Sequence, residues 1–256
     1  MWERIAPLLP QVERNPRYPG RPRLDDRKAL NGIHTGIPWE FLPRELGYGS
    51  GMTCWRRLRD WSDAGVWQRL HELLLAELRG AGVLDFSRAA IDFSHLRAME
   101  GGPATGLSPV DRGKTGSKHH LIVEAHGIPL VTITAGGNRN DVTPLMPLIH
   151  AIPPVRGVRG QPRRRLRHLY ADRGYDHESY RDRVRALQIT PHIARRGTEH
   201  GSGLGEYRWV VEAAIALLHW FRRLPIRWEI CDDIHQAFLA LGCAIIRRRR
   251  LRTTLC

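Results

Sequence analysis

The stretch AAIDFSHLRA, residues 89–98, places an aspartate directly after a short apolar run. This pattern predicts a buried central strand that ends at Asp92, with polar residues beyond it. The stretch LYADRGYD, residues 169–176, repeats the pattern and predicts a second strand that ends at Asp172. A third carboxylate, Glu212, lies in YRWVVEAAIALLHWFRRL, residues 207–224, where apolar residues at helical spacing predict a helix.

The segments around these carboxylates predict further strands and a helix in a fixed order. HHLIVEA (119–125) and PLVTITA (129–135) are strand-like runs joined by a hairpin turn. Beyond Asp172 follow a helix at HESYRDRVRAL (177–187) and a strand at ITPHIAR (189–195). Three antiparallel strands and then two more, with helices between them, is the order of a ribonuclease H-like domain. The expected fold class is therefore α/β, an α+β mixed sheet, for a catalytic domain over residues 86–256.

Two further helices of this domain are predicted from their apolar stripes. Thr143 can cap the first helix and Pro144 suits its first turn. Its buried stripe is expected to consist of Leu145, Leu148, Ile149 and Ile152. The closing helix carries a stripe of Ile234, Phe238, Leu241 and Ile245. Its exit, RRRRLR at 247–252, is expected to be a solvated cationic end, or a phosphate clamp if the protein binds DNA.

Residues 1–85 lack strand patterns and predict a small helical domain. Asp25 can cap one helix and Ser50 or Thr53 a second, and a third is expected from about residue 66 to 78. The second helix has tryptophans near helical period, and its other faces carry Arg56, Arg57 and Arg59. This arrangement favours a helix-turn-helix-like module that binds DNA ends through these arginines. The alternative is a helical packing domain whose arginines are merely solvated.

The overall charge favours a polyanionic partner. The chain has 256 residues, with 40 Lys and Arg against 26 Asp and Glu, a formal net charge of +14. It has no long apolar run, and its start, MWERIAPLLP, contains an acid and two prolines where a signal peptide needs an apolar core. Four scattered cysteines fit neither a zinc site nor a disulfide framework. We therefore expect a cytoplasmic, nucleoid-associated protein with no membrane partner and with double-stranded DNA as its ligand.

The predicted helix around Glu212 has one apolar face and one polar edge. The apolar face is expected to pack on the sheet and comprises Val210, Ala214, Leu217, Leu218, Phe221 and Leu224. The polar edge aligns Glu212 with candidate phosphate ligands, namely Arg208, His219 and Arg222. An exposed helix with an ordinary Arg/Glu pair is the alternative for this segment alone.

Three carboxylates in a basic chain favour divalent-metal chemistry on a phosphodiester. Oxygen ligands suit Mg²⁺, with Mn²⁺ as a possible substitute. Two such ions about 4 Å apart can activate an attacking oxygen and stabilise a leaving one. In this scheme Asp92 bridges both ions, Asp172 holds one and Glu212 the other, so that these three residues are both the catalytic and the metal-binding set.

Motifs in a fixed order along nearly the whole chain resemble a known family. They are GRPRLDDRKALNGI, HTGIPWEFLPRELGYGSGMTCWRRLRDW, GSKHHLIVEAHGIPL, GGNRNDV, LYADRGYD, IARRGTEHGSGLG, RWVVE and FRRL. The chain resembles bacterial insertion-sequence transposases of the DDE class, in the insertion-sequence-five family. The resemblance implies a ribonuclease H-like domain behind a helix-turn-helix-like region, with Asp92, Asp172 and Glu212 as the catalytic triad. It also implies that Lys118 and His119 line the DNA channel, although a solvated strand entrance is the alternative for the histidine.

The resemblance implies an enzyme that cuts phosphodiesters at the ends of its own element. It would then transfer the freed 3′-hydroxyl into target DNA, acting as a homo-oligomer on terminal inverted repeats. Three departures from the family pattern leave a catalytically impaired DNA-binding copy as an alternative, beside a nuclease without strand transfer. The first helix is about one turn short, which predicts poor packing from Ile33 to Trp39. A bulky Phe93 follows the first aspartate, and Ala213 replaces an expected arginine.

Overall fold

The computed structural model describes residues 1–13, 16–18, 20, 22–197 and 203–254. It divides into two compact units, Met1–His71 and Glu72–Cys256. The division falls within helix α4, Val66–Gly80. In the part of the chain that is described, no helix is both long and apolar enough to cross a membrane.

The first unit is helical, as the sequence predicts. After the short α1, Trp2–Ile5, come α2, Asp26–His34, α3, Gly51–Asp63, and the start of α4. The Asp25 side chain caps α2 by accepting from the Lys28 N–H at 3.0 Å. Ser50 caps α3 by accepting from the Thr53 N–H at 3.2 Å, so Ser50 is the cap rather than Thr53. Both predicted helix starts are confirmed because they depend on local hydrogen bonds.

The core of the first unit is closely packed where loose packing was expected. Ile33 is only 1% exposed, and Cys54 and Trp61 are fully buried. A Cβ added at Gly32 would lie 2.7 Å from Cys54 Sγ, and one at Gly51 would collide with the Trp39 carbonyl group. The prediction of poor packing is therefore wrong at Ile33, because Gly32 lets α2 approach α3 directly. Residues 34–39 are half-buried or exposed, so the prediction is not contradicted there.

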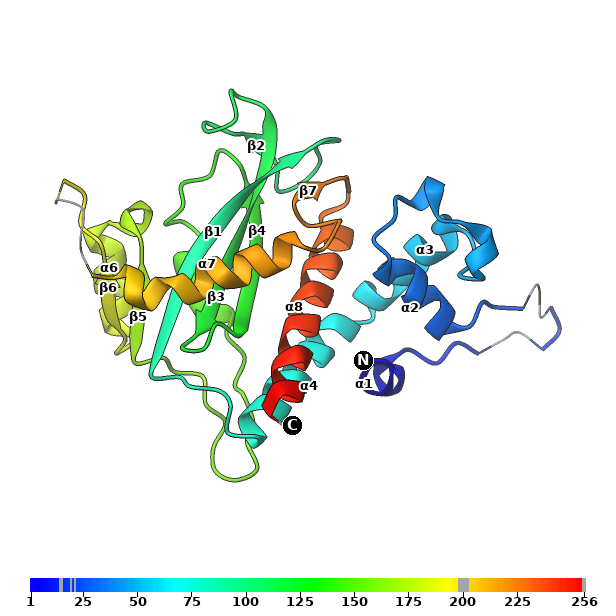
Figure 1. Cartoon of the computed structure of the whole chain (residues 1–256), viewed down its shortest axis with the longest axis horizontal. Helices are drawn as coiled ribbons and strands as arrows, with labels where there is room; N and C mark the ends of the chain where they lie inside the picture. Colours follow the sequence, from blue (N-terminus) through cyan, green and yellow to red (C-terminus); the bar gives the residue numbers. More distant parts are fainter. Residues whose placement is uncertain (14–15, 19, 21, 198–202, 255–256) are drawn as a thin grey trace. The chain divides into compact units, whose positions relative to one another are not determined.

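The second unit contains one mixed sheet with the predicted order (Figure 1). Its main strands run β4-β3-β1-β5-β6. They are β1, Arg88–Ala98, β3, Thr115–Glu124, β4, Pro129–Gly136, β5, His168–Ala171, and β6, Thr190–Ile193. β1, β3 and β4 are antiparallel, whereas β1, β5 and β6 are parallel. This is a ribonuclease H-like sheet, and short β2, Gly106–Leu107, and β7, Ile226–Arg227, extend it.

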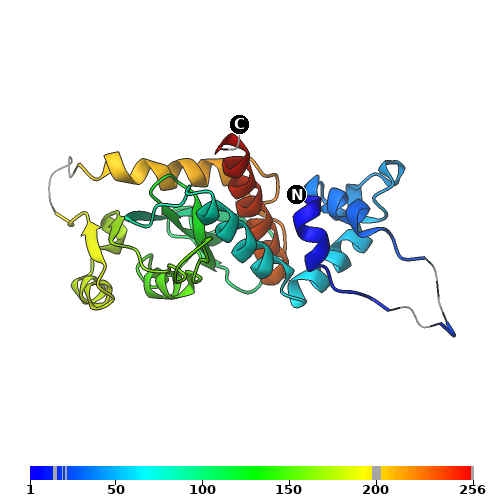
Figure 2. The ribbon, with the colours of Figure 1, turned by 90° about the horizontal axis from the view of Figure 1, so that it is seen from below.

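Helices cover both faces of this sheet. Figure 2 shows α7, Gly205–His219, on one side and α5, Leu145–Ala151, with α6, Glu178–Ala186, on the other. The predicted cap at Thr143 is wrong, because α5 starts after Pro144 without a side-chain cap. The last helix, α8, Asp232–Thr254, packs against β4.

The closing helix α8 is buried on more sides than an amphipathic helix would be. The predicted positions Ile234, Phe238 and Leu241 are buried, while Ile245 is half-buried. Arg247, expected in a solvated cationic end, is 2% exposed and donates from Nε to the Pro129 carbonyl at 2.9 Å. The basic run therefore begins inside the core, where the sheet-forming β4 supplies a hydrogen-bond acceptor.

Candidate active site

Asp92 lies within β1, not at its end. β1 continues to Ala98 because β3 keeps pairing with it, with Asp92 opposite Leu121. The parallel ladder to β5 nevertheless stops at Ala90 and Tyr170, two residues before Asp92. The predicted strand end is therefore wrong for β1 itself but holds for its pairing with β5. The side chain of Asp92 is 15% exposed, so the carboxylate is mostly withdrawn from water.

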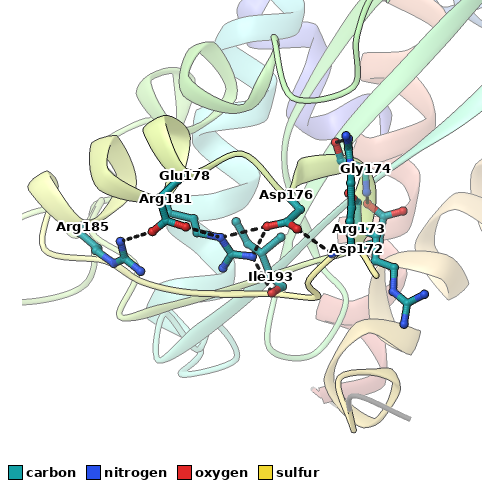
Figure 3. A network of polar contacts seen from close by, with 9 residues as sticks. Asp172, Arg173, Gly174, Asp176, Glu178, Arg181, Arg185 and Ile193 are labelled. Carbon is teal, nitrogen blue, oxygen red and sulfur yellow. Dashed lines mark hydrogen bonds and ion pairs between the residues drawn. The ribbon is translucent and has the colours of Figure 1, made fainter. Parts of the chain in front are cut away.

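Asp172 follows β5 directly, as the sequence predicts. Its carboxylate accepts from the Gly174 N–H at 3.0 Å and starts the 3₁₀ turn Arg173–Tyr175. Figure 3 shows a second contact that holds this turn, in which the Asp176 carboxylate accepts a hydrogen bond from Arg181 Nη2 at 2.6 Å. The same Arg181 nitrogen donates to the Ile193 carbonyl at 2.9 Å, which ties the turn to β6. Asp172 is thus held by a local turn and by a cross-link between neighbouring parallel strands.

Glu212 on α7 is brought to Asp92 by a shared guanidinium. Arg208 Nη2 lies 2.9 Å from Asp92 Oδ2 and 3.8 Å from Glu212 Oε1. Asp92 and Arg208 are 116 residues apart in sequence, so this contact depends on α7 crossing the sheet. Glu212 remains more open to solvent than Asp92, with 60% of its side chain exposed.

The charges of the other two carboxylates act on Asp92. Burial, together with the smaller effect of the charges of Asp172 and Glu212, raises the pKa of Asp92 to about 6. The Phe93 N–H and the Arg208 guanidinium act in the opposite direction. A buried carboxylate with like charges nearby is in the environment that a bound cation relieves.

The donor chemistry of these residues fits a hard divalent cation. Asp92, Asp172 and Glu212 offer carboxylate oxygens, which Mg²⁺ and Mn²⁺ prefer. Gly174 leaves room beside them, since an added Cβ would lie 3.0 Å from Asp172 Oδ1 and 3.5 Å from Asp141 Oδ2. Within the described residues, no three Asp, Glu, His or Cys side chains already form a closed metal site. Of the three candidate ligands, Glu212 has the most exposed side chain and hence the most freedom to move.

Tyr175 and Asp141 also lie beside these carboxylates, a proximity that the local sequence does not predict. Tyr175 is fully buried, and its pKa is raised well above the usual value by burial and by the charges of Asp92, Asp172 and Asp141. Asp141 Oδ1 lies 2.5 Å from Lys118 Nζ. Tyr175 belongs to the motif LYADRGYD and Asp141 to the motif GGNRNDV. Neither motif by itself shows that these two segments meet in the folded chain.

Lys118 and His119 are both buried, so neither a DNA channel nor a solvated strand entrance describes them. Lys118 also donates to the Arg139 carbonyl at 2.7 Å. His119 Nε2 lies 2.7 Å from His235 Nε2 of α8, and the two rings stack with centroids 4.9 Å apart. The expectation fails because β3 is an interior strand whose neighbouring elements cover both of its faces.

Of the other residues predicted to contact DNA, His219 already has a hydrogen-bond partner and Arg222 is exposed. His219 Nε2 lies 3.2 Å from Ser94 Oγ, two residues along β1 from Asp92. Arg222 is exposed but follows the end of α7, so it does not continue the helical edge of Glu212. On the apolar face Leu217 is 37% exposed whereas Val211, on the other side of the predicted stripe, is buried. The face that packs on the sheet is therefore rotated about the helix axis toward Val211.

The arginines of α3 also differ from one another. Arg57 is buried, with Nε 3.0 Å from Asp26 Oδ1 and Nη2 donating to the Leu24 carbonyl at 3.2 Å. Arg56 and Arg59 are exposed, and the Arg59 guanidinium lies 4.9 Å from the centre of the Trp55 ring. Arg56 and Arg59 are therefore open to an external ligand, whereas Arg57 is held by contacts within the unit.

A ribonuclease H-like sheet with two aspartates and a helix glutamate at its centre defines the class of DDE nucleotidyl transferases. Residues 85–247 match the family described as "Transposase DDE domain", and residues 1–71 match "Putative transposase of IS4/5 family". The second match coincides with the first compact unit. The chain belongs to the DDE transposases of insertion sequences, and it is a DNA transposase.

Two relatives from an insertion sequence agree with this assignment. A "Putative transposase for insertion sequence element IS402" from Burkholderia cepacia is 59% identical over 152 residues, which cover 59% of this chain and 72% of the relative. An "Insertion element IS402 uncharacterized 16.2 kDa protein" from the same organism is 54% identical over 114 residues, 43% of this chain and 78% of that one. Among solved structures, a "Mos1 transposase paired-end complex with left transposon end" is 11% identical with a TM-score of 0.30, covering 93% of this chain and 82% of that chain.

Proposed function

We propose that this transposase cleaves phosphodiesters at the ends of its element and joins the freed 3′-hydroxyl to target DNA, with Asp92, Asp172 and Glu212 as its catalytic residues. The observation that supports this assignment is the geometry around Arg208, whose one nitrogen faces both Asp92 and Glu212. Asp172 lies close enough to raise the pKa of Asp92. Three carboxylates that are distant in sequence therefore share one electrostatic environment.

The DDE class implies dependence on a divalent metal, and we propose Mg²⁺ at a two-ion site, with Mn²⁺ as a substitute. Asp92 would contact both ions, Asp172 one and Glu212 the other. When bound, the ions activate the attacking oxygen and stabilise the leaving one. The protein's own contribution is orientation: the strand holds Asp92, the 3₁₀ turn holds Asp172, and α7 carries Glu212. Arg208 compensates the negative charge of Asp92 and Glu212 and is in reach of a substrate phosphate.

The bulky Phe93, one of the departures from the family pattern, does not obstruct this site. Phe93 points away from α7 and packs against His120 and Tyr175, with ring centroids 5.5 Å and 6.4 Å away. Asp92, the next residue on the strand, faces the opposite side of the sheet toward Arg208. The half-buried ring of Phe93 therefore lies on the face of β1 away from Arg208, and an active enzyme remains the proposal.

We propose that the first unit recognises the terminal inverted repeats, through Arg56 and Arg59 on α3. Arg57 stabilises the first unit through its contacts with Asp26 and Leu24 and is not part of the proposed DNA interface. DNA contacts nearer the catalytic carboxylates are proposed for Arg208, His219 and Arg222. Lys118 and His119 are buried, and we propose that they stabilise the structure around those carboxylates. We place the functional boundary at residues 85 and 86, where the DDE match begins. A homo-oligomer on DNA and association with the nucleoid complete the proposal.

The test is a cleavage and joining assay with purified protein, Mg²⁺ and duplexes that carry the flanking inverted repeats. We expect nicks at the repeat ends and, with added target DNA, joined products. Asp92→Ala, Asp172→Ala and Glu212→Ala should each abolish cleavage while most DNA affinity remains, because phosphate contacts elsewhere supply that affinity. Cleavage that survives any one of these changes removes that residue from the site.

A further inference from the structure

An arginine-lined groove lies at the end of the sheet where β1 and β5 begin. It is formed by the loop of residues 156–167, by the segment 85–87 that leads into β1, and by the last turn of α4. Figure 1 draws this loop below the sheet, beside the segment that enters β1. The groove has a volume of about 680 Å³. The three proposed catalytic residues do not line it, so it is a separate site.

Three of its arginines hold the loop in shape. Arg79 of α4 donates to the Val155 carbonyl and, at 3.0 Å, to that of Gln161. Arg164 donates to the His150 carbonyl, and Arg165 to that of Gln188 at 3.3 Å. An antiparallel bridge between Val155 and Arg163 closes the base of the loop. Guanidinium groups of the lining therefore anchor the loop to backbone carbonyls within it and beside it.

The other three arginines carry charge that the unit does not compensate. Arg159, Arg163 and Arg167 are exposed, and across the described part of the chain their guanidinium groups have no hydrogen bond or ion pair. Asp85 is the one acidic residue in the described lining. Its carboxylate already accepts from both the N–H and the hydroxyl of Ser87, each at 2.7 Å. The groove thus combines a fixed shape with unpaired positive charge, which favours an anionic ligand.

We propose that this groove binds the phosphodiester backbone of duplex DNA, away from the carboxylates that do the chemistry. Guanidinium groups match phosphate oxygens in geometry as well as in charge. The one aromatic residue in the lining, Phe86, is buried, so the groove offers no exposed ring for base stacking. Contacts of this kind position a duplex without reading its sequence. The inference rests on the proposed function, since it supplies a second contact for the same DNA.

The distance between the groove and Asp92 is short enough for a single DNA duplex to contact both. Asp92 follows Ser87 by five residues of extended chain, which is about 17 Å at 3.3 Å per residue. This length equals about five base pairs at 3.4 Å each. A duplex that extends fewer than about five base pairs beyond the scissile bond would not touch the groove. A longer flank, or a target duplex, would.

The experiment compares Arg159→Gln/Arg163→Gln with a control of equal charge, Arg183→Gln/Arg185→Gln on α6. Binding of a long duplex is measured from 50 to 300 mM salt, with thermal unfolding to show that both variants are folded. The groove variant should bind at least about tenfold more weakly at 100 mM salt, and its slope of log K against log salt should fall by about 1 to 2. The control should keep the wild-type slope within a few tenths.

Two further arms identify which DNA occupies the groove. If it holds the flank of the element end, the groove variant should lose affinity for long ends and keep wild-type affinity for ends trimmed to the cleavage site. If it holds target DNA, cleavage should be unchanged, while joining of pre-cut ends should need several-fold more target. Both results support the proposal.

Equal losses in the two variants, or a groove variant that matches the wild type in every titration, overturn the proposal. A wild type that binds DNA but never cuts it would count against the proposed chemistry and leave the groove result to be judged on binding alone. A wild type that binds no DNA overturns both.

Discussion

The proposed chemistry requires a negative charge on Asp92, but burial of that charge lowers the stability of the folded protein. Its pKa of about 6 lies above that of an unfolded aspartate, near 3.9. The folded state therefore holds a proton more tightly than the unfolded state, and the carboxyl costs stability as pH rises from about 4 to 6. Above this window the folded protein carries the full cost of a buried negative charge.

Replacing Asp92 with asparagine should therefore abolish cleavage and stabilise the metal-free protein. We expect a gain of about 2 kcal/mol at pH 8, and no gain at pH 4, where the wild-type carboxyl is protonated. Urea unfolding of both proteins at the two pH values measures this difference. Added Mg²⁺ should stabilise the wild type alone, because only its site binds the ion. An equal gain at pH 4 and 8 would show that asparagine improves packing instead.

Arg208 should tune the same carboxyl. Its positive charge lowers the pKa of Asp92, so Arg208→Gln should raise that pKa. The acidic limb of the pH profile of cleavage should then move to higher pH. His219→Gln, on the same helix, should leave the limb in place. A profile that falls uniformly with no shift would mean that Arg208 acts on the substrate and not on Asp92.

Among the elements, β3 and α8 carry an acid-sensitive contact. The rings of His119 and His235 are buried against each other, and burial lowers the pKa of both, that of His235 to about 3. A histidine with a depressed pKa binds a proton in the unfolded state first, so stability is present near pH 7 and is lost as pH falls below about 6.5. The catalytic unit should therefore unfold on mild acidification.

His235→Gln tests this contact. It should reduce the pH dependence of the free energy of unfolding between pH 6 and 4 by up to about 1.4 kcal/mol per pH unit, the value for one proton. The measurement belongs in an Asp92→Asn background, because Asp92 has the opposite sign in part of this range. His150→Gln, which alters an exposed side chain, is the matched control. An unchanged slope would exclude the pair as a source of acid lability.

Helix α3 separates a structural arginine from two that are free to bind. Arg57→Ala should lower the stability of the first unit by about 2 kcal/mol, since it removes a buried partner of Asp26. Arg56→Ala/Arg59→Ala should leave stability within about 0.5 kcal/mol and reduce discrimination between repeat and random DNA. Chemical unfolding and competition binding measure the two effects. Stability loss in the double variant would show that the exposed arginines also support the fold.

For the whole molecule, the net charge of +14 is spread over two units that each have a candidate DNA contact. If both contact the same DNA, losses in binding free energy from Arg56→Ala/Arg59→Ala and from Arg159→Gln/Arg163→Gln should add within about 0.5 kcal/mol. Binding of the combined variant to a long repeat-bearing duplex measures this sum. A combined loss equal to the larger single loss would show that the two surfaces are used in alternative complexes.

Local signals predicted much of this protein from sequence alone. The caps Asp25 and Ser50, the hairpin before Pro129 and the position of Asp172 each depend on residues a few positions apart. Such interactions form within one turn or one strand end, so their residue types reveal them. The order of these segments then restricts the sheet to few topologies, of which the ribonuclease H-like one was predicted and is observed.

Contacts between distant segments were decided only in the tertiary structure. Asp92 lies within β1 because β3 pairs past it, and Lys118 and Arg57 are buried because acids 23 and 31 residues away lie beside them. Arg208 faces Asp92 across 116 residues of chain. An arginine or lysine in a basic sequence looks the same whether it binds DNA or a buried carboxylate. Its role depends on which surfaces pack together, and packing is a property of the folded chain, not of any local stretch.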